Sequence, residues 1–264
     1  MTQTLPYSTE LLECVEAGSE NLLLGAKAVS RVLNPDADLT KVDSRLLSLA
    51  EEIQKRGESV ESMLHVFHDE GFKRVDEDKF HEYANSDIAY VLDTRKGIPI
   101  TYVAIILGVS DHLSLTSHGV NFPGVFLAQV DDTIVNPIDF SILNYEEFTS
   151  NLKKRNINVP DSPELASNSD ILKRMFNNLQ EVASAKGDDL RRLEFVDYME
   201  LIEPEDWFCH FKRAEAWASM GDYSAARSEL KIAKNLLTDE STIAMIDRNL
   251  AQLPKRTDGD QILN

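Results

Sequence analysis

The chain has 264 residues, enough for one large domain or two smaller ones with separate cores. Hydrophobic residues make up 42% and charged residues 27%, which are ordinary values for a globular protein. Asp and Glu number 45 against 27 Lys and Arg, so the net charge is −18. A duplex-binding protein needs a basic surface to displace counterions, so this charge argues against nucleic-acid and anionic-membrane partners.

Cysteine and histidine are too sparse to predict a disulfide framework or a metal site. Cys14 and Cys209 lie far apart without C-x-x-C neighbours, and His65 and His68 lack the glutamate of an H-E-x-x-H motif. Residues 1–6 have neither the basic region nor the apolar core of a signal peptide. No apolar run approaches the roughly 18 residues of a membrane span. We therefore expect a cytoplasmic protein without a metal or other cofactor.

The first part of the chain has helical periodicity. Apolar residues in 22–33 form a helical stripe that stops before Asn34. Those in 39–53 alternate three- and four-residue steps, the spacing of one buried helix face. The pattern continues through 60–67 to Gly71, which suits the end of a helix. We expect three amphipathic helices here.

The periodicity then changes from helix to strand. A short helix over 88–92 is ended by the Gly-Ile-Pro at 97–99, and 101–113 is apolar almost all round, as in a buried helix. Short β-rich runs follow at 118–127 and 133–137, separated by turn residues. Helices first and strands afterwards predict an α+β domain with a small antiparallel sheet.

The best candidate for a domain boundary is the polar, Asn-rich segment 154–170. It divides the chain into a first domain at 1–160 and a second at 161–264. The second domain reads as wholly helical, and Gly-Asp pairs begin at Gly187 and at Gly221, 34 residues apart. This spacing is the period of the tetratricopeptide repeat, so we predict an all-α, tetratricopeptide-like tail.

The segment from Asn85 to Asn136 has the layout of a papain-type catalytic core. A helix ends in a turn, a buried helix follows, and two strands come after it. In such a core the nucleophile starts the buried helix, while the base and an orienting carboxylate lie on the strands. Pro99, Val125 and Asn136 occupy these three places.

This segment resembles the transglutaminase-like core of the SirB-type bacterial proteins. Their Arg-x-Gly-Ile-Pro-Ile-Thr turn is matched at 95–101, and their Gly-Val-x-Phe-Pro-Gly-His-Phe-Leu run is matched at 119–127 except for its histidine. The resemblance extends over most of the chain. It implies a transglutaminase-like, papain-like fold followed by tetratricopeptide-like repeats, and a regulatory role in bacteria.

The resemblance also implies which groups are missing. In active transglutaminase-like enzymes a cysteine lies two residues after the glycine that corresponds to Gly97, where this chain has Pro99. Proline suits a first helical position but offers no nucleophile. The expected histidine is Val125 and the expected carboxylate is Asn136. A Cys–His–Asp system would therefore have lost all its reacting groups.

Three other residues keep an enzymatic alternative open. His118 begins the strand that should carry the base, and Thr101 supplies a hydroxyl in the right turn. We expect Thr101 to be the N-cap of the next helix. Asp139 could replace the carboxylate only if its strand slipped in register. The alternative function is thus a peptidase or amidase that uses His118 with Thr101 or Asp139.

The leading hypothesis is a non-catalytic scaffold that recognises a protein partner or a peptide segment. In the tail, Phe211 and Glu215 would line a concave binding face if the repeat register around Gly221 holds, or would pack internally. A third hypothesis is a small-molecule binding module in the old cleft, which requires a pocket lined by Val125 and Phe126.

Overall fold

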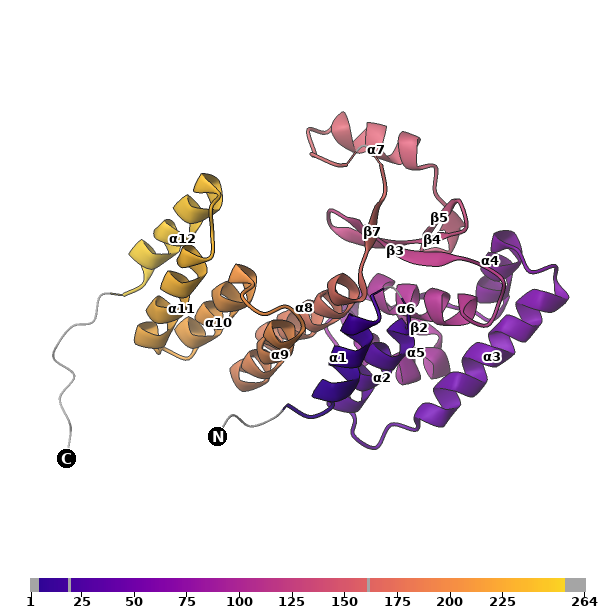
Figure 1. Ribbon diagram of the computed structural model, residues 1–264, viewed down its shortest axis with the longest axis horizontal. Helices are drawn as coiled ribbons and strands as arrows, with labels where there is room; N and C mark the ends of the chain where they lie inside the picture. Colours follow the sequence, from indigo (N-terminus) through magenta and orange to yellow (C-terminus); the bar gives the residue numbers. More distant parts are fainter. Residues whose placement is uncertain (1–4, 19, 161, 255–264) are drawn as a thin grey trace. The chain divides into compact units, whose positions relative to one another are not determined.

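A computed structural model describes residues 5–18, 20–160 and 162–254. The chain divides into two compact units, Met1–Asn178 and Leu179–Asn264. Figure 1 labels the helices and strands of each unit. The predicted class is confirmed: helices precede a small antiparallel sheet, and the C-terminal region is helical.

In its described residues, the first unit contains helices, two short 3₁₀ turns and seven strands. The helices are α1 (Ser8–Glu16), α2 (Leu22–Leu33), α3 (Leu39–Lys55), α4 (Val60–Asp69), η1 (Glu77–Lys79), η2 (Tyr83–Ser86), α5 (Ile88–Thr94), α6 (Pro99–Ser110), α7 (Tyr145–Lys153) and the first part of α8 (Asn168–Lys186). The strands are β1 (Lys73–Arg74), β2 (Lys96–Gly97), β3 (Ser117–Phe122), β4 (Val125–Val130), β5 (Thr133–Asn136), β6 (Ser141–Ile142) and β7 (Glu164–Ala166).

The three predicted amphipathic helices form as α2, α3 and α4. Ser59 caps the start of α4 by accepting a hydrogen bond from the backbone N–H of Ser62. At the other end Gly71 has a φ of 79°, a left-handed conformation that glycine adopts without strain. The N–H of Phe72 then donates to the carbonyl of Phe67, and the two rings pack at 4.9 Å. This is a Schellman-type helix end with its apolar contact.

Helix α6 is the centre of the first unit. Its residues from Ile100 onward are buried, and it contacts α2, α3, α5 and strands β3 and β4. Pro99 occupies the first helical position, as expected, and Ile98 before it is extended. The prediction that Thr101 caps this helix is wrong. Because Pro99 fixes the first helical position, the N-cap is Ile98, and Thr101 lies inside the first turn.

The main sheet has the order β6-β5-β4-β3-β7, and all its neighbouring strands are antiparallel. Strands β3 and β4 form a hairpin in which Phe122 is opposite Val125, and Gly124 in the turn has a φ of 82°. One face of the sheet packs on α6 (Figure 1). The other face packs on α7 through the cluster that contains Val120, Phe122 and Leu127.

The polar segment after residue 160 belongs to the first unit, which differs from the predicted boundary between 160 and 161. Strand β7 pairs with β3 at the sheet edge, with Ala166 opposite Gly119. Asn168 donates from Nδ2 to the carbonyls of Cys14 (2.8 Å) and Glu20 (2.6 Å). An edge strand has one side free for solvent, so polar residues there need not mark a linker. The boundary between the two units falls within α8, after Asn178.

The second unit is helical, with the end of α8 followed by α9 (Asp189–Ile202), α10 (Trp207–Ser219), α11 (Tyr223–Asn235) and α12 (Glu240–Gln252). Its two Gly-Asp turns are alike. Gly187 and Gly221 have φ values of 70° and 83°. Asp188 and Asp222 each accept a hydrogen bond from the N–H three residues later, at 3.2 and 2.9 Å. The same helix end and helix cap therefore recur at the predicted spacing.

Small residues contribute to a core cluster formed by α10, α11 and α12 of the second unit. Ala214, Ala226 and Ala233 are buried together with Leu230 and Ile246. Alanine lets helices approach closely, because its side chain ends at Cβ. Across the described residues of both units, no helix has the length and apolar character to cross a membrane. Residues 1–4, on which part of the signal-peptide expectation rests, lie outside the described ranges.

Candidate functional site

Pro99 and Val125, predicted to replace a nucleophile and a base, line the same cavity of about 190 Å³ in the first unit. Asn136, predicted to replace the carboxylate, does not line it, although Ile138 two residues later does. The structure thus brings together two of the three positions. The third lies at the end of the neighbouring strand β5.

The turn before Pro99 is held by the side chain of Tyr102. Its hydroxyl donates to the carbonyls of Lys73 (2.6 Å) and Arg95 (3.0 Å), which joins the turn to β1. Burial raises the pKa of Tyr102 well above its usual value. Gly97 has no room for a side chain, because a Cβ there would lie 2.7 Å from Cγ1 of Val91. The packing against Val91 therefore requires glycine at position 97.

Val125 begins β4 and is half-buried at the cavity wall. It also packs against the apolar cluster between the sheet and α7. A valine side chain cannot accept or release a proton. Its position therefore provides shape and apolar contact, with no acid–base chemistry.

Asn136 and Asp139 stabilise the turn that follows β5. The Oδ1 atom of Asn136 accepts from the N–H of Ile138 at 3.1 Å. The Oδ1 atom of Asp139 accepts from the N–H and the hydroxyl of Ser141, at 3.2 and 2.7 Å. Both side chains make the local hydrogen bonds that Asn and Asp commonly make in turns.

The three candidate substitutes are not brought together. His118 is opposite Gln129 on β4, four residues beyond Val125, which corresponds to about 13 Å along a strand. The Thr101 hydroxyl is buried and donates to the carbonyl of Asn85 at 2.8 Å. Within the described part of the chain, no hydrogen bond joins His118 to Thr101 or to Asp139.

The cavity beside Pro99 combines apolar walls with two cationic side chains. Arg74 extends from β1 with its guanidinium 5.5 Å from the ring centroid of Phe80. Arg174 and Asn178 come from α8. Among the described residues, no acidic side chain lines the cavity. The remaining walls are Ile98, Pro99, Ile100, Gly124, Val125, Phe126 and Ile138.

Sequence reasoning missed Arg74 and Arg174. Neither residue belongs to a sequence motif. Arg74 ends the short strand β1, and Arg174 lies on the amphipathic helix α8. Only the fold places both on one cavity, because β1 pairs with β2 directly before Pro99, and the start of α8 packs under the sheet. Neither arginine forms an ion pair with another described residue.

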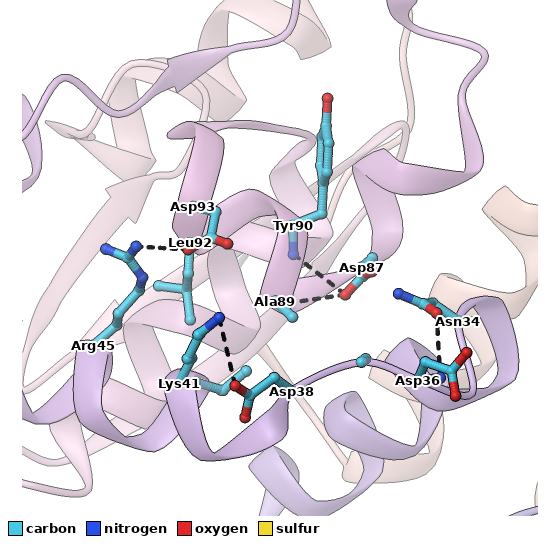
Figure 2. Close-up of a pocket in the computed structure, with 12 residues that line it drawn as sticks. Asn34, Asp36, Asp38, Lys41, Arg45, Asp87, Ala89, Tyr90, Leu92 and Asp93 are labelled. Atoms are coloured by element: carbon cyan, nitrogen blue, oxygen red, sulfur yellow. Dashed lines mark hydrogen bonds and ion pairs between the residues drawn. The ribbon is translucent and has the colours of Figure 1, made fainter.

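A second cavity, of about 250 Å³, lies between the α2–α3 loop and α5 (Figure 2). Its charged groups already interact with one another. Arg45 pairs with Asp93 at 2.7 Å, Lys41 pairs with Asp38 at 3.5 Å, and Asp87 caps α5. This cavity contains none of the predicted site residues, and its charges are largely compensated internally.

In the tail, Phe211 is half-buried and packs against the alanine-rich core of the second unit. Glu215 pairs with Arg192 at 2.7 Å and with Lys212 at 3.4 Å. Their assignment to a binding face stays a prediction. In the described ranges, no group of three or more His, Cys, Asp or Glu side chains is arranged to hold a metal ion.

Comparisons with known proteins agree with this architecture. The model of the transglutaminase-like superfamily matches residues 36–177, more than half of the chain. A UPF0162 protein of Vibrio cholerae is 28% identical over 47% of this chain and 49% of its own length, so the match spans about half of that relative. UPF0162 proteins of Xylella fastidiosa and Pseudomonas aeruginosa are 25% and 24% identical.

The alignments with the Xylella fastidiosa and Pseudomonas aeruginosa proteins are longer than the one with the Vibrio cholerae protein. They cover 88% and 85% of this chain, and 89% and 86% of the relatives. No solved structure matches the chain. The superfamily match includes the turn before Pro99, the buried helix α6, the main sheet and the cavity. The chain therefore belongs to the transglutaminase-like superfamily.

Proposed function

We propose that the protein recognises a partner without catalysing a reaction, through a transglutaminase-like pseudoenzyme domain joined to a tetratricopeptide-like tail. The observation that carries the proposal is the lining of the cavity at Pro99 and Val125. The described residues that line it include no thiol, hydroxyl, imidazole or carboxylate. A cleft with such walls can hold a ligand but has no group to attack it.

Acyl transfer needs a nucleophile, a base that takes its proton and a group that orients the base. Loss of the nucleophile or the base from such a system reduces kcat by roughly 10⁶-fold. Replacing both, as at Pro99 and Val125, leaves only binding. The fold would then be retained for its shape.

The alternative is a residual peptidase or amidase that uses His118 with Thr101 or Asp139. The hydrogen bonds of the candidate groups count against it. Thr101 already donates its hydroxyl proton to Asn85, and Asp139 accepts two hydrogen bonds within its own turn. Both would have to leave these partners before they could act with His118.

For the tail, the matching turns at Gly187 and Gly221 support the tetratricopeptide-like assignment, and with it the SirB-type architecture. Repeats of this kind bind peptides or proteins on a concave face. Phe211 and Glu215 are our candidates for that face. The partner is thus a protein or peptide segment.

Turnover assays on the full-length protein test the proposal. We would incubate it with fluorogenic peptide and amide substrates, and separately with a glutamine peptide and a labelled amine. The proposal predicts the same rate as buffer alone, unchanged in His118→Ala, Thr101→Val and Asp139→Asn. Turnover that disappears in His118→Ala would establish the enzymatic alternative.

A further inference from the structure

We propose that the cavity beside Pro99 binds a short apolar ligand that ends in a carboxylate. Arg74 and Arg174 would bind the carboxylate, and the walls at Pro99 and Val125 would contact the hydrocarbon part. This inference deepens the proposed function by naming a class of ligand. It rests on that function, because the ligand is bound without being converted.

The charge of the cavity is opposite to that of the chain. The protein carries a net charge of −18, yet this cavity is lined by two guanidinium groups and no carboxylate. Neither Arg74 nor Arg174 has an ion-pair partner in the described residues. Like charges on one small cavity repel each other, and a bound anion reverses that repulsion. The two guanidinium groups therefore favour an anionic ligand in this cavity.

The environments of the two arginines suit a planar oxyanion. The Arg74 guanidinium lies over the ring of Phe80, which engages its face and leaves its N–H edges free. Arg174 is placed by the first part of α8, where neighbouring Ile171 and Leu172 are fully buried. Arginine binds carboxylates through two parallel N–H···O hydrogen bonds, which gives both affinity and orientation.

The rest of the cavity selects an apolar body of limited size. Ile98, Ile100, Phe126 and Ile138 line it beside Pro99 and Val125. Its volume of about 190 Å³ lies below the roughly 300–1,000 Å³ of pockets for drug-sized ligands. The ligand is therefore the size of one amino acid or a short fatty acid, smaller than a nucleotide cofactor.

Two sources supply this chemistry: a free short-chain acid, or the C-terminal residue of a peptide. Both present one carboxylate beside an aliphatic group. The second cavity, near α5, fits this ligand less well, because its cations Lys41 and Arg45 are already paired with aspartates. A matched set of probes separates these possibilities.

The test uses full-length protein and calorimetric or ligand-observed NMR titration. The probes are N-acetyl-leucine, its neutral amide, and 4-methylpentanoate. We expect N-acetyl-leucine to bind at least about tenfold more tightly than the amide, because only the acid makes charge-assisted hydrogen bonds. Equal binding of 4-methylpentanoate would assign the site to free acids, and weaker binding would assign it to peptide C-termini.

Charge-neutralising variants locate the site. Arg74→Gln and Arg174→Gln should each weaken N-acetyl-leucine binding by about tenfold, with little effect on the amide. Arg155→Gln is the matched control, since Arg155 is exposed, belongs to the same unit and lies outside the cavity. Arg74→Lys should restore part of the binding. Melting curves establish that each variant is folded.

The inference is overturned if neither acid binds, if acid and amide bind equally, or if Arg155→Gln has the same effect as the cavity variants. Mass spectrometry of the recovered ligand tests the proposed function separately. A bound ligand that returns hydrolysed would contradict non-catalytic recognition while supporting the binding site. No binding together with no turnover would contradict only the binding site.

Discussion

Pro99 begins the buried helix α6 and has a side chain without a nucleophilic group. It follows the extended residue Ile98 and starts α6, where its fixed φ and missing N–H cost nothing. A cysteine nucleophile at this position would lie at the N-terminus of a helix, which lowers the pKa of a thiol. A proline there keeps the helix but supplies no reactive group.

Cys14 is a buried thiol whose ionisation should couple to folding. Burial raises its pKa to about 11 from 9.0, despite a backbone hydrogen bond that opposes the rise. Below pH 9 the thiol is protonated in both states, so its contribution to stability does not change there. Between pH 9 and 11 only the unfolded thiol ionises, so the free energy of unfolding falls by on the order of 2–3 kcal/mol.

Urea unfolding at pH 8 and pH 11 measures this effect. Burial also raises the pKa of Tyr102, so wild type is compared with Cys14→Ala, in which the tyrosine is unchanged. We expect wild type to lose more stability over this range than the variant. The same loss in both proteins would contradict the assignment to Cys14.

Gly97 offers a packing prediction. A Cβ at this position would lie 2.7 and 3.0 Å from the two γ-carbons of Val91, so Gly97→Ala must displace the α5–β2 turn. We expect a loss of about 1–3 kcal/mol in the free energy of unfolding. Gly108→Ala is the control, because its nearest contact is the flexible end of Leu46 at 3.2 Å. Equal effects in urea denaturation would contradict this account.

At the scale of elements, the spacing of apolar residues predicts which helices form and which faces they bury. Helices α2, α3 and α4 show clear helical spacing, and α6 is apolar all round because strands and helices surround it. Strand β7 was not predictable in this way, because it lies at the sheet edge with Glu164 and Leu165 exposed. For that reason its polar neighbourhood resembled a linker.

The candidate site was predictable only in part. Pro99 and Val125 follow from the order of turn, helix and strand, and both do line one cavity. Arg74 and Arg174 could not be predicted, because neither belongs to a motif and their proximity depends on long-range strand pairing and helix packing. The expected cap at Thr101 failed because the sequence does not show that its hydroxyl bonds to Asn85.

The tail contains an ion network that connects α9, α10 and α11. Arg213 contacts Asp197 at 2.8 Å, Glu200 at 2.6 Å and Glu229 at 3.7 Å, and its side chain is 12% exposed. Although burial opposes it, hydrogen bonds to Asp197 and Glu200 raise the pKa of Arg213 above its ordinary value. The guanidinium therefore holds three carboxylates together.

Arg213→Met should destabilise the second unit by about 1–3 kcal/mol, because it removes the guanidinium from Glu229, whose side chain is 18% exposed, and from the more exposed Asp197 and Glu200. Urea unfolding followed by helical circular dichroism measures the loss. Arg248→Met, on the exposed side of α12, removes the same charge and serves as the control. A similar small effect in both variants would mean that the network contributes little to stability.

At the scale of the whole molecule, the superfamily fold and the proposed loss of chemistry fit together. The chain retains the buried helix, the antiparallel sheet and a cavity between them, while the positions proposed for nucleophile and base carry apolar side chains. The same cavity carries two of the 27 basic residues of a strongly acidic chain. Recognition of an anionic ligand in this cavity is the function that we propose from these features together.

The most direct test of the central claim is to restore the missing groups. We would measure the alkylation rate of the introduced thiol at pH 6 in Pro99→Cys and in Pro99→Cys/Val125→His, with peptide mass analysis to separate it from buried Cys14. If the two positions are a vacated nucleophile and base, the histidine should lower the thiol pKa and raise the rate about tenfold or more. Equal rates in the two folded variants would contradict the claim.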